Sequence, residues 1–233
     1  MNLTLPVEEP AGAGRGATVS HRVFDALRRA IVQGRLLPGN TLSEADVAKQ
    51  LGVSRQPVRE AFIKLAEAGL VGIRPQRGTL VLLISRREVE NARFLREAIE
   101  VAIARKAALE ATPAHIAVMR ETLEAQREAS ARGDAPAFIS ADDALHQAIA
   151  RSAECEHAWK VLDGLKVQMD RVRYLSMEEA TPIPVLIAQH DAIVDAIAAG
   201  DPDKAEAAMH THLSEILRSL PRIVAAHPEM FSA

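Results

Sequence analysis

The stretch LGVSRQPVREAF, residues 51–62, decides the fold of the N-terminal third of this chain. Its leading Leu-Gly pair ends one helical pattern, and Ser54 is a favourable N-cap for the next helix. Pro57 is tolerated there because the amides of a first helical turn have no intrahelical acceptor. Arg55 and Arg59 stand one turn apart and therefore share a face. The stretch predicts a helix that begins, after a short break, with a basic and exposed side.

The flanking segments predict further short elements. Apolar residues upstream recur at helical spacing, namely Val23, Leu27, Ala30 and Ile31. They indicate a first helix that ends near Gly34. Ser43 predicts the N-cap of a second helix. Its buried side is assigned to three apolar residues, Leu42, Val47 and Leu51. Downstream, residues 70–84 predict two short strands around Pro75-Gln76-Arg77-Gly78, a hairpin in which glycine is available for a positive φ.

Two helices joined by a short break and followed by a basic hairpin are typical of a winged helix-turn-helix. In this motif the second helix places its first side chains against base edges, and the planar guanidinium fork of Arg suits guanine or phosphate. Residues 20–84 hold ten Lys/Arg against five Asp/Glu, a net charge of +5, whereas residues 85–233 hold seventeen against twenty-four, a net of -7. We therefore predict that residues 19–84 bind double-stranded DNA. A capped surface helix with two solvated arginines is the alternative interpretation.

Composition indicates a helix-rich globular protein. The 233 residues are 48% hydrophobic and 25% charged, with only 3% aromatics. Cys155 is the single cysteine, which excludes an intrachain disulfide and fits a reducing compartment. Apolar runs fall short of the roughly 18 residues of a membrane span. We expect a cytoplasmic protein with no membrane partner, and a disordered tail over the Gly- and Pro-rich residues 1–18.

From Ser85 onward the pattern is helical to the end. The predicted segments are 86–111, 113–131, 134–151, 155–179, 184–199 and 202–225. Pro221 is expected to kink or shorten the last of them. The fold class predicted is mainly α, with the winged helix-turn-helix followed by an all-helical antiparallel bundle of about six helices over residues 85–233.

The string LSEADVAKQLGVSRQPVREAFIKLAEAGLVGIRPQRGTLV, residues 42–81, resembles the DNA-binding domain of GntR-type bacterial transcription regulators. The resemblance implies operator contacts from the start of the recognition helix and the wing tip, namely Ser54, Arg55, Gln56, Arg59 and Gly78. Gln56 stands where the family usually has Thr. Ala45 stands where many members have a phosphate-contacting Arg, so that contact is missing or is replaced by Arg35 or Arg77.

A second group of residues has metal-ligand character. Asp142 and His146 are i and i+4 on one predicted helix, and His190 and His212 lie on two later helices. Three imidazoles and one carboxylate that converge inside a bundle would suit Zn²⁺ or another borderline divalent metal. Spacing alone also permits the alternative that these are surface or core-edge histidines.

Residues 85–228 resemble the FCD effector-binding domain of the FadR branch of the same family. Metal-binding members of that branch use an Asp and three His that match Asp142, His146, His190 and His212, which implies a bound divalent metal, with Zn²⁺ favoured and Ni²⁺ or Mn²⁺ compatible. This chain departs from the family pattern where Leu145 replaces Phe and Gln189 replaces a frequent Glu, and it lacks the Asn often found after the Asp/His helix.

The resemblance also assigns an effector pocket. Arg96 and Glu100 match an Arg-x-x-x-Glu pair of the family, and Arg173 and Tyr174 are further pocket candidates. An i,i+4 Arg–Glu pair can be an ordinary salt bridge, or Arg96 can point inward and bind a carboxylate through its planar fork. Both interpretations remain open at this point.

The function predicted is that of a homodimeric, ligand-responsive transcription regulator, a repressor that a small carboxylate metabolite releases from DNA. One alternative is an architectural DNA binder whose bundle only dimerises. The other is a metal-dependent hydrolase. Glu215 and Asp143 are acids near the His/Asp motifs, but neither has the spacing of a general base, and the sequence offers no nucleophile or phosphate loop. We therefore predict that the protein is not an enzyme.

Overall fold

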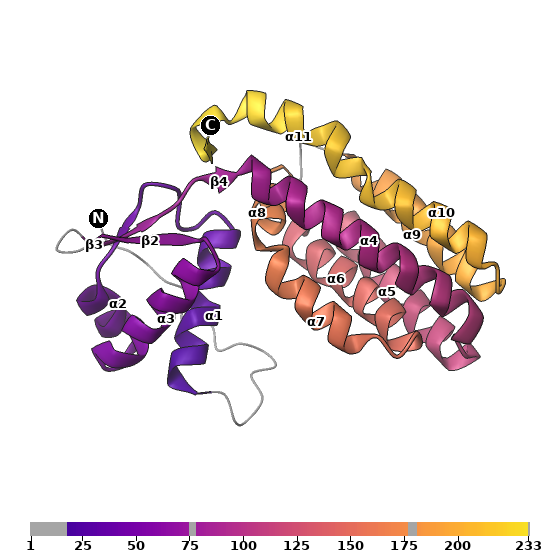
Figure 1. The fold of residues 1–233 in the computed structure, drawn as a ribbon, viewed down its shortest axis with the longest axis horizontal. Helices are drawn as coiled ribbons and strands as arrows, with labels where there is room; N and C mark the ends of the chain where they lie inside the picture. The colour runs from indigo at the N-terminus through magenta and orange to yellow at the C-terminus, as the bar shows by residue number, and fades with distance from the viewer. Residues whose placement is uncertain (1–17, 75–77, 177–180, 233) are drawn as a thin grey trace. The chain divides into compact units, whose positions relative to one another are not determined.

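The computed structural model describes residues 18–74, 78–176 and 181–232. The chain forms two compact units. One ends at Ser85 and includes residues 229–232, and the other spans Arg86–Pro228 (Figure 1). Of the tail predicted over residues 1–18 only Thr18 is described. Across the described ranges, none of the helices is long and apolar enough to cross a membrane.

The first unit contains the predicted helix-turn-helix. Its three helices are α1 (Val19–Val32), α2 (Glu44–Leu51) and α3 (Arg55–Glu67). Gly52 ends α2 in the left-handed conformation with φ 63°, and Ser43 caps that helix by accepting from the Asp46 amide at 3.4 Å. Ser54 occupies the N-cap of α3, although its side chain makes no capping hydrogen bond. α1 and α2 pack against α3 over a buried apolar core, namely Leu27, Val47, Val58, Phe62 and Leu65.

A three-stranded antiparallel sheet completes this unit, in the order β1-β3-β2. The predicted hairpin is β2 (Val71–Arg74) with β3 (Gly78–Val81), while residues 75–77 of its turn lie outside the described residues. β1 (Thr41–Leu42) was not predicted, and Leu42, which was expected on the buried side of a helix, is buried from this strand instead. A two-residue strand has too little periodicity to be recognised before its partner is known.

The second unit is an all-helical bundle, which confirms the mainly α fold class. Its helices are α4 (Arg86–Glu110), α5 (Pro113–Ala131), α6 (Ala135–Ser152), α7 (Glu156–Leu165), α8 (Val167–Ser176), α9 (Ile183–Ala198), α10 (Pro202–Leu213) and α11 (Glu215–Ala226). α5 packs on α6 and α9, and α10 packs on α4 and α9 (Figure 1). Apolar side chains from α4, α5, α6, α7, α9 and α10 form one buried core, and Ala129, Phe138 and Ile139 form a second cluster.

Eight described helices replace the six predicted segments because two segments are interrupted. The segment 155–179 breaks at Lys166, whose fully buried ammonium group contacts Asp143 and Asp170, each at 2.9 Å; residues 177–179 lie outside the described ranges. The segment 202–225 breaks at Ser214 rather than at Pro221, which lies inside α11. Helical periodicity continues across both breaks, and only the tertiary contacts reveal them.

The C-terminus is a second correction. The sequence predicted helix to the end, but β5 (Phe231–Ser232) pairs in parallel with β4 (Ile84–Ser85). Phe231 is buried in this pairing at 7% exposure. The paired residues Ile84 and Phe231 are 147 positions apart in the chain, so no local pattern could have predicted the pair.

The junction of α6 and α7 holds Glu154 at φ 54°, the one non-glycine residue with positive φ among the described residues. The Cys155 amide donates to the Ala150 carbonyl at 2.7 Å and the Glu154 amide to Arg151 at 3.0 Å, which is a Schellman ending that favours glycine. We predict that Glu154→Gly raises the free energy of unfolding by about 0.5–1 kcal/mol, because removal of Cβ relieves the left-handed strain.

Thermal or urea unfolding measures this effect. Glu154→Ala is the matched control, since it removes the same carboxylate but retains Cβ. Equal stabilisation by both variants would show that charge, and not backbone strain, is responsible.

Candidate metal centre and nucleic-acid interface

The recognition helix carries its two arginines at the surface, with side chains 68% and 60% exposed for Arg55 and Arg59. Both contact Glu44 at the start of α2. Arg59 donates to the two carboxylate oxygens at 3.0 and 3.2 Å, and an Arg55 nitrogen lies 3.5 Å away. The hydrogen bond from Arg59 lowers the pKa of Glu44. The three side chains therefore form one exposed ionic cluster, held between the two helices of the motif.

The remaining predicted DNA contacts are distributed over the same unit. Gln56 donates to Glu60 at 3.2 Å. Arg35 is exposed in the loop after α1, and Arg77 lies outside the described residues. Gly78 has φ 86°, and a Cβ at this position would approach Thr41 Cγ2 to 3.0 Å, so a side chain here would be strained and glycine is favoured. Sequence reasoning missed Glu44; its place in the first turn of α2, where acidic residues are favoured, was the available signal.

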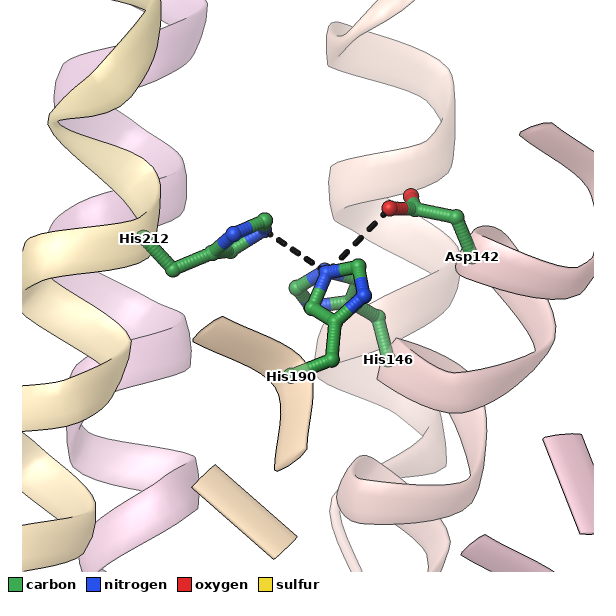
Figure 2. A group of neighbouring side chains, drawn as sticks. All are labelled: Asp142, His146, His190 and His212. Carbon is green, nitrogen blue, oxygen red and sulfur yellow. Dashed lines mark hydrogen bonds and ion pairs between the residues drawn. The ribbon is translucent and has the colours of Figure 1, made fainter. Parts of the chain in front are cut away.

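The four predicted metal ligands converge in the second unit. Asp142 and His146 come from α6, His190 from α9 and His212 from α10, and all four are buried (Figure 2). One potential ligand atom from each lies within 4.8 Å of the others. His190 Nε2 is 3.3 Å from both His212 Nε2 and Asp142 Oδ1. Residues that are up to 70 positions apart, from Asp142 to His212, thus share one small volume.

The imidazoles of His190 and His212 are hydrogen-bonded from behind through Nδ1, and that of His146 has a carboxylate beside its Nδ1. His190 Nδ1 lies 2.7 Å from Gln126 Oε1, and His212 Nδ1 lies 3.1 Å from Gln189 Oε1. His146 Nδ1 lies 2.5 Å from a carboxylate oxygen of Glu100.

The orientation of the Gln126 and Gln189 side-chain amides follows from the groups that their Nε2 atoms contact. Gln126 Nε2 donates to the Ala141 carbonyl at 3.4 Å, and Gln189 Nε2 donates to Glu215 at 3.3 Å. A carbonyl and a carboxylate only accept, so each amide must turn its oxygen toward a histidine. His190 and His212 therefore carry their proton on Nδ1 and turn Nε2 toward the centre of the cluster, the arrangement in which metal-bound histidines are usually held.

Gln126 was not predicted as part of this site. It is fully buried and continues the apolar stripe of Met119 and Leu123 on α5 at helical spacing. A polar amide on such a stripe was a usable signal, because a buried amide needs partners.

The electrostatics of the cluster fit a cation. Burial lowers the pKa of His190 to about 4 and that of His212 well below its ordinary value, so both rings are neutral. Burial by itself raises the pKa of Asp142, but the guanidinium of Arg173 outweighs it and keeps the carboxylate ionised. His146 Nε2 is buried without a hydrogen-bond partner among the described residues. Neutral nitrogens, one carboxylate and an unpaired inward nitrogen are the donor set that a divalent metal satisfies.

A cavity of about 90 Å³ adjoins the cluster. Its polar lining includes Arg96, Asp142, Arg173, His212 and Glu215, and its apolar lining includes Phe138, Met169, Ile183, Leu186, Leu213 and Ile216. Arg96 is buried, donates to Glu100 at 2.5 Å, and keeps one nitrogen, Nη2, without a partner among the described residues. The salt bridge and the inward orientation foreseen for Arg96 thus coexist.

The other effector candidates are placed differently. Arg173 lines the cavity, but its guanidinium contacts Asp142 at 2.5 Å, Asp143 at 2.9 Å and Asp170 at 3.2 Å. Glu100 lies behind His146 rather than among the cavity-lining residues. Tyr174 packs against the apolar cluster of Ala129, Phe138 and Ile139, and is likewise absent from that lining.

A winged helix-turn-helix followed by an all-helical unit is the architecture of a class of transcription regulators. Comparison with known families agrees. Residues 19–81 match the family of bacterial regulatory proteins named gntR, and residues 92–215 match the FCD domain. The chain belongs to the GntR family and carries an FCD domain.

Individual proteins of this family resemble the chain over nearly its whole length. It is 43% identical over 214 residues to the HTH-type transcriptional repressor RspR of Escherichia coli K12, covering 92% of this chain and 94% of the relative. A solved GntR regulator from Rhodococcus sp. RHA1 has a TM-score of 0.72 at 28% identity over 89% of this chain and 98% of that one. McbR/YncC of E. coli has the same fold, with a TM-score of 0.76 at 21% identity over 91% and 99%. The protein is a transcription regulator and not an enzyme, and GntR regulators bind operator DNA.

Proposed function

We propose that this protein is a homodimeric cytoplasmic repressor that a divalent metal and a small carboxylate control together. In this proposal residues 19–84 form the DNA-binding domain, and residues 85–233 form the effector-binding and dimerisation domain. The proposed operator contacts are Arg35, Ser54, Arg55, Gln56, Arg59, Arg77 and Gly78.

The metal would be held by Asp142, His146, His190 and His212, with zinc as the first choice. The observation that carries this assignment is the inward turn of the histidine Nε2 atoms, fixed from behind by side-chain oxygens. When bound, the metal supplies a cationic Lewis-acid site next to the cavity. The chain's own contribution is to keep the rings neutral and to hold Asp142 through Arg173.

The effector carboxylate would bind Arg96, whose Nη2 is a buried donor without a partner among the described residues. An unsatisfied buried donor of this kind costs about 1–3 kcal/mol, which an acceptor on the ligand would remove. The cavity walls come from α4, α6, α8, α9, α10 and α11. A ligand that contacts all of these helices would bind one arrangement of them more tightly than another. This difference in ligand affinity between the two arrangements would change the affinity for DNA.

The test is operator binding by the full chain. Fluorescence anisotropy would compare DNA from upstream of its own coding sequence with random DNA of equal length, over a salt series, for chelated and Zn²⁺-loaded protein. We expect a salt-dependent preference for the upstream DNA that a small carboxylate weakens in the Zn²⁺-loaded form. Lack of any preference would contradict the regulator assignment. A preference indifferent to metals and acids would favour the architectural alternative.

The contact of Glu44 with both recognition arginines leads to a further prediction. Glu44→Gln should raise affinity for random DNA several-fold, because a carboxylate that repels phosphate is removed. The ratio of operator to random affinity should fall, because Arg59 loses the partner that fixes its fork. The anisotropy assay measures both quantities. Glu67→Gln, at the far end of α3, is the matched control; an equal change there would indicate a general charge effect.

A further inference from the structure

The C-terminal strand attaches the DNA-binding unit to the helical bundle a second time. β5 pairs in parallel with β4, and both strands belong to the first unit (Figure 1). The chain passes from the first unit into the bundle after Ser85 and returns to the first unit after Pro228. Two covalent crossings, and not a single linker, therefore join the two units.

A buried ring and one hydrogen bond hold β5 on β4. Phe231 is only 7% exposed, and its Cα partner Ile84 is fully buried. The Ser232 hydroxyl donates to the Ile84 carbonyl at 3.4 Å. A parallel pair of two residues has little stability of its own. Burial of the Phe231 ring must therefore supply most of the attachment.

The path from the bundle to β5 is short and structured. α11 ends at Ala226, and the His227 amide still donates to the Ile223 carbonyl at 2.9 Å. A 3₁₀ helix, Pro228–Met230, then leads directly into Phe231. The residue steps from Ala226 to Phe231 span at most about 17 Å when fully extended, and less in this helix. A displacement of the end of α11 therefore either carries β5 with it or detaches β5 from β4.

The two helices that adjoin this strand pair are also walls of the cavity. α4 begins at Arg86, directly after β4, and carries Arg96 into the cavity lining. α11 contributes Glu215, Ile216 and Ser219 to the same lining. A change in the position of α11 relative to α4 therefore acts on both strands of the pair.

We propose that β5 is a strap that restrains the motion of the DNA-binding unit relative to the bundle, and that Phe231 is its anchor. The consequence for DNA rests on the proposed homodimeric function. Two restrained units lose less freedom when they occupy the two half-sites of an operator, so the strap raises operator affinity.

Hydrogen exchange of the full chain tests the anchor. Phe231→Ala should speed the exchange of amides in residues 82–86 by about tenfold or more, because β4 loses its partner. The matched control is Leu109→Ala, which removes a 69% exposed apolar side chain near the end of α4 and should leave these amides unchanged. Unchanged exchange in Phe231→Ala would show that this ring does not hold the strap, and would overturn the proposal.

A locked strand pair tests the restraint itself. Ser85 and Ser232 are Cα partners, and adjacent strands lie about 4.8 Å apart, within the range that a disulfide spans. Ser85→Cys/Ser232→Cys, combined with Cys155→Ser to remove the chain's single cysteine, keeps β5 on β4 when oxidised. A second version adds about twelve Gly/Ser residues between Ala226 and His227, which gives the strap on the order of 20 Å of slack but leaves the pair intact.

Nitrogen-15 relaxation of the oxidised proteins, without DNA, measures the motion directly. Without the insert, amides of the DNA-binding unit should share the rotational correlation time of the bundle. The insert in the strap should shorten that time by about a third or more. The same insert between Gly133 and Asp134, inside the bundle, is the matched control and should not. Equal correlation times with and without slack in the strap would overturn the proposal.

Operator binding measures the consequence for DNA. The version with slack should bind the upstream DNA about tenfold more weakly than the locked protein without it, while affinity for random DNA changes much less. Equal operator affinities would overturn the role of the strap in DNA binding but leave the proposed function intact. If no version prefers the upstream DNA, the proposed function fails, and the relaxation result alone decides the strap.

Discussion

Zn²⁺ added to chelated protein should raise its free energy of unfolding by about 2.7 kcal/mol at 100 times the Kd. The reason is that the four ligands are adjacent only in the folded chain, since they come from three helices and lie within 4.8 Å there. For a domain of this size the increase corresponds to a rise in melting temperature of about 5–10 °C. Differential scanning fluorimetry with Zn²⁺, Ni²⁺ and Mn²⁺ would measure it and rank the metals.

His190→Ala should abolish this response, because His190 is fully buried at the centre of the cluster and lies 3.3 Å from both Asp142 and His212. The matched control is His210→Ala, an exposed histidine that pairs with Glu97 outside the cluster. The shift should persist in that control. A wild-type protein that does not respond to any of the three metals would contradict the metal assignment.

An independent signal comes from Trp159, whose ring stacks on His146 with centroids 6.1 Å apart and an angle of 4° between the planes. Metal binding at His146 should change the fluorescence of this single tryptophan, and the change should saturate at one metal per chain. A thermal shift without a fluorescence change would place the metal elsewhere.

The double variant Arg55→Ala/Arg59→Ala should lose about 2–6 kcal/mol of operator affinity, because each bidentate guanine contact contributes about 1–3 kcal/mol. Affinity for random DNA should fall much less, since base contacts carry the specificity. The two side chains are 68% and 60% exposed, so the melting temperature of the protein should remain close to that of the wild type. Anisotropy titrations on operator and random DNA, at one fixed salt concentration, measure the difference.

The control for this pair is Arg132→Ala, which removes an equally exposed arginine from the second unit. It should leave both affinities within about twofold of the wild type. Equal losses of the double variant on operator and random DNA would mean that the arginines contact phosphate only, and would contradict their role in reading bases.

The sequence by itself determined the elements whose signals are local. The break at Gly52, the recognition helix after Ser54 and the hairpin ending at Gly78 follow from cap and turn chemistry within a few residues. It also located Asp142 and His146 on one helical face, because residues at i and i+4 lie on the same side of a helix. The helical breaks at Lys166 and Ser214 were not predicted, since periodicity continues through them.

Only the tertiary structure decided what lies behind each site residue. Glu100, Gln126 and Gln189 each contact the Nδ1 atom of a histidine on another helix. For His190 and His212 this contact fixes Nε2 as the ring nitrogen that faces the cluster. Local sequence does not distinguish Arg96 from Arg173. In the structure Arg96 keeps one nitrogen without a partner among the described residues, whereas Arg173 contacts three carboxylates. Charge neutralisation and tautomer choice depend on distances of about 3 Å between segments far apart in the chain. Such distances are set by the packing of the whole bundle and have no counterpart in local sequence.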